Sequence, residues 1–418
     1  MKRRQFIQRT ALAAGASSAL TACVHGWTWQ NRVAAQPVTQ NENGARAADT
    51  PRLIVIFLRG AADGLNIVVP YQEPNYYASR PSVAIAKPGQ ENGALDLDGQ
   101  FGLHPALKAL MPAWERKQLA FVHASGSPIV ERSHFQAQDY IETATPGSKS
   151  TADGWLNRLL GVLPSGSSTQ AVNIGQTAPL ILTGVEPFAS LAVSSAINRD
   201  LPIDQPQVKD PFDRLYSGND LLSQTYQEGR AAREVLVREF REENEAASRG
   251  APAPNQFLTS AQYVARLMAG DAVTQIAFMA LGNWDTHVNE RPVLERHLGF
   301  LGDGLAALAE GLGPVYEHTA VVVMSEFGRT VAENGSGGTD HGLGNVMWLL
   351  GGGIKGGKVY GEWPGLEATE LHQNRDLAVT TDFRDVLISL LAPQFDLNER
   401  QIAQVFPAYQ AQQRLNLV

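Results

Sequence analysis

Carboxylate and imidazole side chains follow several of the apolar runs in this sequence. Each run has the composition of a buried strand, and in an open α/β sheet the ligand site lies outside the carboxyl ends of the strands. Divalent cations, zinc above all, bind this mixture of carboxylate oxygen and imidazole nitrogen. The acidic and imidazole residues that we select as candidate metal ligands are Asp63, Asp285, His287, Glu326, Asp340 and His341.

Each of these residues, taken alone, has an ordinary structural explanation. An Asp in a loop between strand and helix usually forms a turn or caps the helix, and a lone His usually has a structural role. The pattern gains weight because five successive segments, "RGAADGLN", "ERSHF", "NWDTH", "SEFGR" and "TDHG", carry such residues next to predicted strands. We therefore expect one site that these segments share.

Ser133 is the candidate nucleophile at this site. It opens the predicted helix "SHFQAQDYIETA" (133–144) and lies beside His134. A hydroxyl at a helix N-terminus near a metal would be activated, and the helix dipole would favour a bound anion. The alternative is that Ser133 only caps its helix. Both interpretations stay open at the level of sequence, and Arg329 is the candidate residue that stabilises the developing charge.

The elements that would position these residues alternate between strand and helix. Strands are predicted at "RLIVIFLRG", "QLAFVHA", "QAVNIG", "PLILTG", "VTQIAFMALG", "TAVVVMSEF" and "NVMWLLGGGI", with helices at 104–117, 133–144, 154–163, 258–270 and 291–312. This alternation predicts an α/β fold with a mainly parallel sheet and helices on both faces. The charged stretch at about 200–256 is predicted to be a helical insertion in a domain that covers residues 51–418.

Composition excludes several functional classes. The 418 residues carry a net charge of −8, and the sequence contains no dense Lys/Arg run, so binding to nucleic acid is not expected. No Gly-x-Gly-x-x-Gly follows a predicted strand and there is no Cys cluster, so a redox enzyme finds no support. Beyond the leader, no apolar run is long enough to span a bilayer.

The first 35 residues have the pattern of an export signal. "KRRQFIQ" contains the paired arginines and the phenylalanine of a twin-arginine signal, and "TALAAGASSAL" is its apolar core. Cys23 in "LTAC" fits a lipobox, while cleavage after Ala35 is the competing prediction. Residues 36–50 are predicted to form a flexible tether. We expect a periplasmic protein that contacts the membrane through an N-terminal lipid only if Cys23 is the cleavage site. Without a thiol pair it has no disulfide framework and no Cys-based zinc site.

Longer motifs carry a resemblance to a known family. They are "FLRGAADGLNIVVPY", "FGLHPAL", "ERSHFQAQDYIETA", "GNWDTHVNE", "VVVMSEFGRT" and "TDHGLGNVMWLLGGGIKGGKVYGE", which lie between about residues 52 and 365. The chain resembles the twin-arginine-exported bacterial family of unknown function numbered 1501 and, more broadly, the alkaline-phosphatase/sulfatase superfamily. The resemblance implies an alkaline-phosphatase-like fold.

The superfamily pattern can be carried over residue by residue. It implies that Asp63 is the metal ligand after the first strand, that Ser133 is the nucleophile, and that Asp285 with His287 and then His341 are further ligands. Glu326-Phe327 departs from the usual Asp-His or Asp-Asn and puts a second metal site in doubt, although Asp340 is a candidate to compensate. Sulfatase chemistry by formylglycine is set aside because "SGSPIVERSHF" does not contain the required signature.

These observations lead to two alternative functions. The first is a metal-dependent hydrolase, with one or two ions, that acts on a small anionic ester, phosphate in preference to sulfate. The second is a non-catalytic binding or assembly protein on the same fold with a degraded metal site. The sequence indicates no particular protein partner.

Overall fold

A computed structural model describes residues 49–164, 169–175, 177–191, 247–270 and 273–418, with a few separate positions between 211 and 223. They belong to one compact unit, Arg46–Val418. The predicted export signal, the tether up to residue 48, and the predicted insertion from 200 to 246, apart from those few positions, lie outside the described residues.

The main sheet has nine strands among the described residues, in the order β13-β5-β12-β9-β1-β8-β6-β7, with β14 paired to β5. All neighbouring strands run parallel except β12, which is antiparallel to both β5 and β9. This confirms the predicted mainly parallel sheet. The strands are β1 (Arg52–Leu58), β5 (Leu119–Gly126), β6 (Ala171–Ile174), β7 (Ala189–Leu191), β8 (Ile276–Leu281), β9 (Thr319–Ser325), β12 (Asn345–Leu350), β13 (Lys358–Tyr360) and β14 (Thr381–Asp382).

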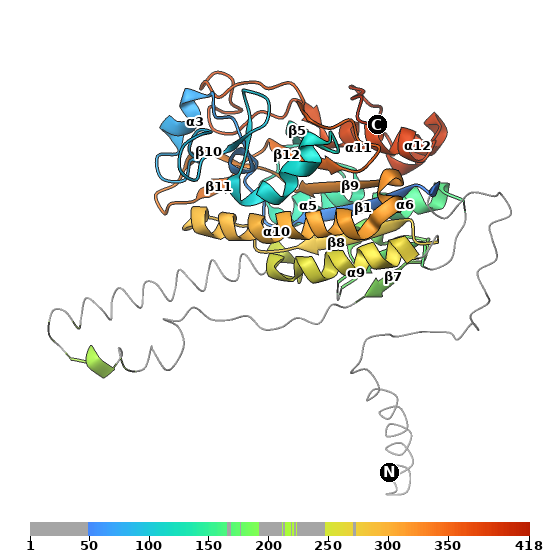
Figure 1. Ribbon diagram of the computed structural model, residues 1–418, viewed down its shortest axis with the longest axis horizontal. Coiled ribbons are helices and arrows are strands. Elements are labelled where there is room, and N and C mark those ends of the chain that lie inside the picture. Colours follow the sequence, from blue (N-terminus) through green and yellow to red (C-terminus); the bar gives the residue numbers. More distant parts are fainter. Residues whose placement is uncertain are drawn as a thin grey trace, which may run out of the picture. The chain divides into compact units, whose positions relative to one another are not determined.

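Helices cover both faces of this sheet because its central strands are apolar on both sides. In β1, Ile54, Ile56 and Leu58 belong to one buried cluster and the alternating residues belong to the other. The first cluster is covered by α4 (Met111–Glu115), α9 (Phe257–Gly270) and α10 (Glu290–Leu312), and Figure 1 shows α9 and α10 side by side. The second is covered by α5 (His134–Thr143), α6 (Trp155–Val162), α11 (Phe383–Gln394) and α12 (Glu399–Val405).

Two smaller sheets lie outside the main one. One contains β2 (Val68–Val69), β3 (Leu95–Asp96) and β4 (Gly102–Leu103), and the short helices α2 (Gly64–Ile67) and α3 (Pro74–Ser79) flank β2 in the sequence. The other is the hairpin of β10 (Arg329–Glu333) and β11 (Thr339–His341). Its antiparallel register places Arg329 opposite His341, so the hairpin brings His341 back to the end of β9.

The predicted elements differ from the structure in two places. The segment "PLILTG" contains a 3₁₀ helix at Leu180–Leu182, not a strand, because a short apolar run does not distinguish a buried strand from a buried helical turn. The predicted helix 104–117 is a 3₁₀ helix at Pro105–Leu110 followed by α4; the non-helical backbone of Leu107 marks the kink inside the 3₁₀ helix.

None of the helices within the described part of the chain has the length and apolar character needed to cross a membrane.

Candidate metal centre

The candidate metal centre lies at the carboxyl ends of the central strands. Leu58 of β1 pairs with Leu281 of β8 and with Ser325 of β9, so these three strands end in one row. The antiparallel strand β12 begins at the same edge, where Asn345 pairs with Ser125 near the end of β5. The segments before β12 and after β5, β8 and β9 therefore meet, as the sequence predicts.

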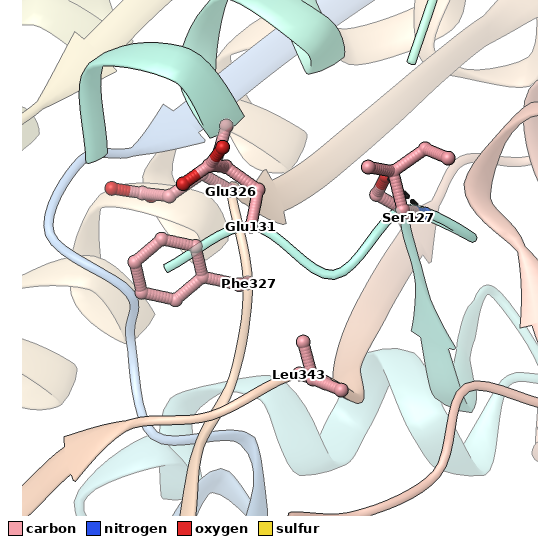
Figure 2. A pocket seen from close by; sticks show the side chains of 7 residues that line it. Ser127, Glu131, Glu326, Phe327 and Leu343 are labelled. Carbon is pink, nitrogen blue, oxygen red and sulfur yellow. Dashed lines mark hydrogen bonds between the residues drawn. The ribbon is translucent and has the colours of Figure 1, made fainter. Parts of the chain in front are cut away.

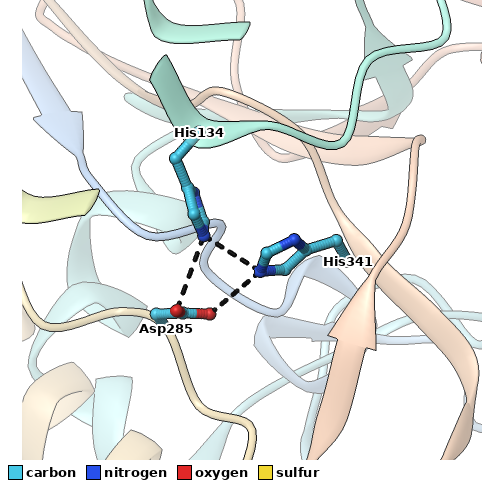
Figure 3. A group of neighbouring side chains, drawn as sticks. All are labelled: His134, Asp285 and His341. Carbon is cyan, nitrogen blue, oxygen red and sulfur yellow. Dashed lines mark hydrogen bonds and ion pairs between the residues drawn. The ribbon is translucent and has the colours of Figure 1, made fainter. Parts of the chain in front are cut away.

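Two imidazoles and a carboxylate form the tightest group at this edge (Figure 3). The Nε2 atoms of His134 and His341 are 2.9 Å apart. Asp285 places Oδ1 3.3 Å from His341 Nε2 and Oδ2 3.5 Å from His134 Nε2. The ligand atoms of these three residues all lie within 4.8 Å of one another, which is close enough to hold one metal ion.

A third imidazole contacts the edge of this group. His287 Nε2 is 2.9 Å from His341 Nε2 and 3.0 Å from Asp285 Oδ1. It follows Asp285 by two residues on the segment after β8, so both side chains are placed by the end of the same strand. The site therefore contains three imidazoles around one buried carboxylate.

The second nitrogen of each ring is bonded to an oxygen that has no hydrogen to give. His341 Nδ1 donates to the backbone carbonyl of Arg132 at 2.9 Å. His134 Nδ1 donates to Glu326 at 2.7 Å, and His287 Nδ1 donates to Asp340 at 3.2 Å. Because Nδ1 carries the hydrogen, each neutral ring directs the lone pair of Nε2 toward the group. This is the arrangement of metal-binding histidines, in which an outer oxygen fixes the tautomer.

Electrostatics favours a cation at this position. Burial would raise the pKa of Asp285, but its contacts with the rings of His134, His287 and His341, with nearby Arg329, hold it far below its usual value. Burial would lower the pKa of His134, but bonds to Asp285 and Glu326 raise it to about 9. Without a metal, a proton must therefore lie between the Nε2 atoms of His134 and His341, which are 2.9 Å apart. Ligands of a tetrahedral zinc lie about 3–4 Å apart, so the donor set fits such an ion.

Glu326 supports the group from outside. Its Oε1 accepts hydrogen bonds from His134, from the backbone nitrogen of Gly60 at 2.8 Å and from Gln138 Nε2 at 3.0 Å. Burial would raise its pKa, but these bonds and the charge of His134 lower it to about 2. Glu326 is thus a fixed negative charge that orients His134.

The comparisons with known proteins identify the family. The model of the family described as "Protein of unknown function (DUF1501)" matches residues 50–406. The chain belongs to this family. The search of curated proteins finds no match to the DUF1501 chain.

Solved structures similar to this DUF1501 chain are distant. Ps i-CgsB in complex with k-i-k-neocarrahexaose has a TM-score of 0.38 and 11% identity, over 84% of this chain and 74% of that one. The C-terminal periplasmic domain of EcEptC from Escherichia coli, in complex with Zn, has a TM-score of 0.33 and 10% identity, over 73% and 74%. A second structure of that domain has a TM-score of 0.37 and 10% identity, over 88% and 90%.

The DUF1501 chain brings most of the sequence-predicted ligands together. Asp285 and His341 belong to the central group, His287 contacts it, and Glu326 and Asp340 accept from the outer nitrogens of two rings. Among the described residues, these five predicted side chains form one connected network.

Asp63 is the predicted ligand that the structure does not bring into this network. Arg80 donates to Oδ2 of Asp63 at 2.5 Å and to Oδ1 at 3.1 Å, and both side chains are fully buried. Glu290 lies beside the same carboxylate. We correct the prediction for Asp63 because a guanidinium already occupies both of its oxygens.

Arg329 also differs from its predicted role. Its guanidinium is buried and donates to the carbonyl oxygens of Gly60, Ala61, Trp284 and Thr339. It also donates to Asp285 Oδ1 at 2.5 Å. With its donors directed at the protein, Arg329 positions Asp285; it is not placed to stabilise charge on a substrate.

Ser133 occupies the N-cap position of α5, as predicted, and is exposed. Its hydroxyl makes no capping hydrogen bond to the helix, so the structure gives it no capping role through the side chain. The next residue, His134, supplies an imidazole that our candidate set omits. The only signal for it in the sequence is its position at the helix start in "ERSHF".

A very small cavity is lined by Glu326 and Phe327 (Figure 2). Its volume is about 10 Å³, which is about the space of one water molecule. Glu131 and Glu326 lie on one side of it and Ser127 lies across from them.

Proposed function

We propose that this protein is a metal-dependent hydrolase that acts on a small anionic ester, phosphate in preference to sulfate. The observation that carries the proposal is the set of imidazoles whose Nε2 atoms converge on Asp285 while oxygen acceptors hold every Nδ1. Such a set is costly to bury without a cation. A three-ligand site that leaves one position open is the arrangement of catalytic zinc centres.

We propose one zinc ion for this centre. Imidazole and carboxylate ligands suit zinc. His134, Asp285 and His341 would hold the ion, and His287 lies beside them. Within the described residues no second group of three such side chains comes equally close. The Arg80–Asp63 ion pair supports a single ion, because it leaves a second ion without one of the predicted carboxylate ligands.

Ser133 is the residue that we propose as nucleophile. When bound, the ion would polarise the ester as a Lewis acid. Ser133 begins the ten-residue helix α5 directly before His134, and its exposed hydroxyl is not used by the helix cap. Its oxygen would form a bond to phosphorus as the bond to the leaving alcohol breaks, with solvent accepting the serine proton and supplying one to the alcohol. Water would then hydrolyse the phosphoserine. The N-terminus of α5 would favour the developing charge.

We also propose the finer assignments of fold and location. The order of the motifs along the chain supports an alkaline-phosphatase-like fold, and the motif "KRRQFIQ" supports twin-arginine export to the periplasm. Cys23 would carry a lipid, or the leader would be cut after Ala35.

A non-catalytic binding protein is the second candidate. The observation that favours it is the Ser133 hydroxyl, for which the described residues provide no hydrogen-bonded general base. In that case the metal would have a structural role.

The experiment is elemental analysis of the mature protein followed by assays with phosphomonoesters, phosphodiesters and sulfate esters. We expect about one zinc per chain and turnover of a phosphate ester. Ser133→Ala and Ser133→Asp should both abolish turnover and retain zinc. Zinc without turnover of any ester would favour the binding protein, and full activity of Ser133→Ala would exclude Ser133 as nucleophile. Protein without stoichiometric metal after export would contradict the metal centre itself.

A further inference from the structure

A large cavity adjoins the candidate metal centre. It has a volume of about 430 Å³ and lies between α3, β10 and the segment 366–375. This volume is within the range of small-molecule sites, about 300–1,000 Å³. The cavity is more than large enough for a phosphate group alone, so its size indicates that it binds a larger part of a ligand.

Asp340 connects the cavity to the metal centre. Its half-exposed carboxylate lines the cavity, and its Oδ1 accepts the Nδ1 hydrogen of His287. The other nitrogen of the same ring, Nε2, contacts His341 and Asp285. A single imidazole ring therefore separates the cavity wall from the central group.

The charged groups of the cavity wall carry an excess of negative charge. Glu333, Asp340 and Glu367 line it, and none of them forms an ion pair with Lys or Arg among the described residues. The arginine of the wall, Arg375, shares the buried Asp376 with Arg132, and the three carboxylates outnumber it. Such a wall repels a second anion on the ligand and accepts hydrogen bonds from hydroxyl groups.

Uncharged polar groups complete the wall. Asn75 and Ser79 come from α3, and Asn374 comes from the segment 366–375. The wall is mixed, because Val331, Leu366, Ala368 and Leu371 line it beside these polar groups. A lipid chain would leave these polar groups without partners, which costs free energy.

We propose that this cavity binds the alcohol portion of the ester, and that this alcohol is a neutral, hydroxyl-rich group of about the size of a sugar. The inference rests on the proposed function, because it assigns the part of the substrate that does not react. The phosphate would lie at the metal centre, and the hydroxyl groups would donate to the carboxylates and amides of the cavity.

Two phosphate esters of equal ring size test the chemistry of the cavity. Glucose 6-phosphate has a ring with hydroxyl groups, while cyclohexylmethyl phosphate has a ring without them. We expect the zinc-loaded protein to prefer glucose 6-phosphate by at least about tenfold in kcat/KM. The polar groups of the wall would lack hydrogen-bond partners in the complex with cyclohexylmethyl phosphate. Equal kcat/KM values for the two esters would overturn the proposal.

A variant that narrows the cavity tests its location. Ala368 lies on the wall and is exposed, so Ala368→Phe should reduce kcat/KM for glucose 6-phosphate about tenfold. Methyl phosphate is too small to need the cavity, and its kcat/KM should not change. The matched control is Ala403→Phe on the exposed side of α12, which should change neither value. Equal losses for both esters in Ala368→Phe would overturn the assignment.

The cavity proposal can still be tested if the wild-type protein hydrolyses no ester. That result would refute the proposed function, and binding of glucose 6-phosphate by saturation-transfer NMR would then test the cavity. Binding that is lost in Ala368→Phe and retained in Ala403→Phe would support it. No binding to the wild type, or the same binding to both variants, would overturn it.

Discussion

Two groups of buried carboxylates lie near the same edge of the sheet, and their partners differ. Asp285 meets His134, His287 and His341, with Arg329 behind it. Asp63, in contrast, meets Arg80 on both oxygens and has Glu290 beside it. In the sequence both acids follow an apolar run, and only the histidine two residues after Asp285 distinguishes their surroundings.

The difference shows how the partner decides whether a buried acid needs a cation. Arg80 cannot lose its proton, so the group around Asp63 is neutralised by the protein itself. The imidazoles around Asp285 can lose a proton from Nε2, and because their Nδ1 atoms are bonded to oxygen, the Nε2 lone pairs then point at one another. That group is complete only with protons or a metal ion. The first group is structural, and the second is suited to bind an ion.

The largest expected effect follows from removing one imidazole of the second group. His341→Ala takes away the ring that contacts both His134 and His287. Bound zinc should fall from about one equivalent to almost none, because two remaining central ligands do not hold the ion tightly. Elemental analysis of the purified variant measures this.

The matched control for this variant is His318→Ala. His318 is a half-exposed histidine in the turn before β9, and its loss should leave the zinc content unchanged. A full equivalent of zinc in His341→Ala would contradict the inference that the group around Asp285 binds the ion.

The next effect concerns the first group. Arg80→Met leaves Asp63 buried without its partner and should lower the free energy of unfolding by about 3–5 kcal/mol. Arg80 also donates to the carbonyl oxygens of Thr330 and Val331, which places the expected loss toward the upper end. Urea denaturation measures the change. Zinc content should stay near that of the wild type under conditions where the variant is folded.

Arg400→Met on the exposed surface of α12 is the control, and we expect it to change stability by less than about 0.5 kcal/mol. If Arg80→Met lost its zinc while its stability was unchanged, the roles of the two groups would be the reverse of those inferred.

Much of the fold could be predicted because buried strands are short apolar runs with clear turn signals. The "RLIVIFLRG" and "TAVVVMSEF" runs contain β1 and β9, with their ends displaced by at most two residues. The direction of β12 could not be predicted, since a strand buried on both faces has the same composition whether it runs parallel or antiparallel. The 3₁₀ helix at Leu180–Leu182 could not be predicted either, because its short apolar run has the same composition as a buried strand.

Only those residues of the candidate site that lie close to strand ends could be predicted from the sequence. Asp285 and His341 are next to strands, so a rule about strand ends selects them. His134 was not selected because the neighbouring Ser133 matches the nucleophile of the superfamily. Asp63 was selected because it follows the first strand. Its partner, Arg80, is 17 residues away, so the ion pair that occupies Asp63 could not be predicted from the sequence.

The smallest effect that we predict is a change in pH dependence from the carboxyl group beside Asp63. Glu290 is fully buried, and burial together with Asp63 raises its pKa well above the ordinary value of 4.5. Its oxygens accept from Thr339 Oγ1 at 2.5 Å and from Asn66 Nδ2 at 3.2 Å. The folded protein therefore keeps a proton that the unfolded chain releases above pH 4.5.

A raised pKa in the folded state stabilises the protein below the unfolded pKa, and this stabilisation is lost as pH rises toward the folded pKa. Glu290→Gln replaces the proton with a permanent N–H that cannot be lost. The free energy of unfolding of this variant, relative to wild type, should therefore increase between about pH 5 and about pH 8. Urea denaturation of the zinc-free proteins at several pH values measures this difference in unfolding free energy. The histidine titrations that the variant shares with wild type cancel in the difference.

The control is Glu399→Gln, at an exposed position of α12, whose unfolding free energy relative to wild type should not change with pH. A difference between Glu290→Gln and wild type that does not vary with pH would mean that Glu290 is charged in the folded protein; the group around Asp63 would then carry a net negative charge and would itself need a cation.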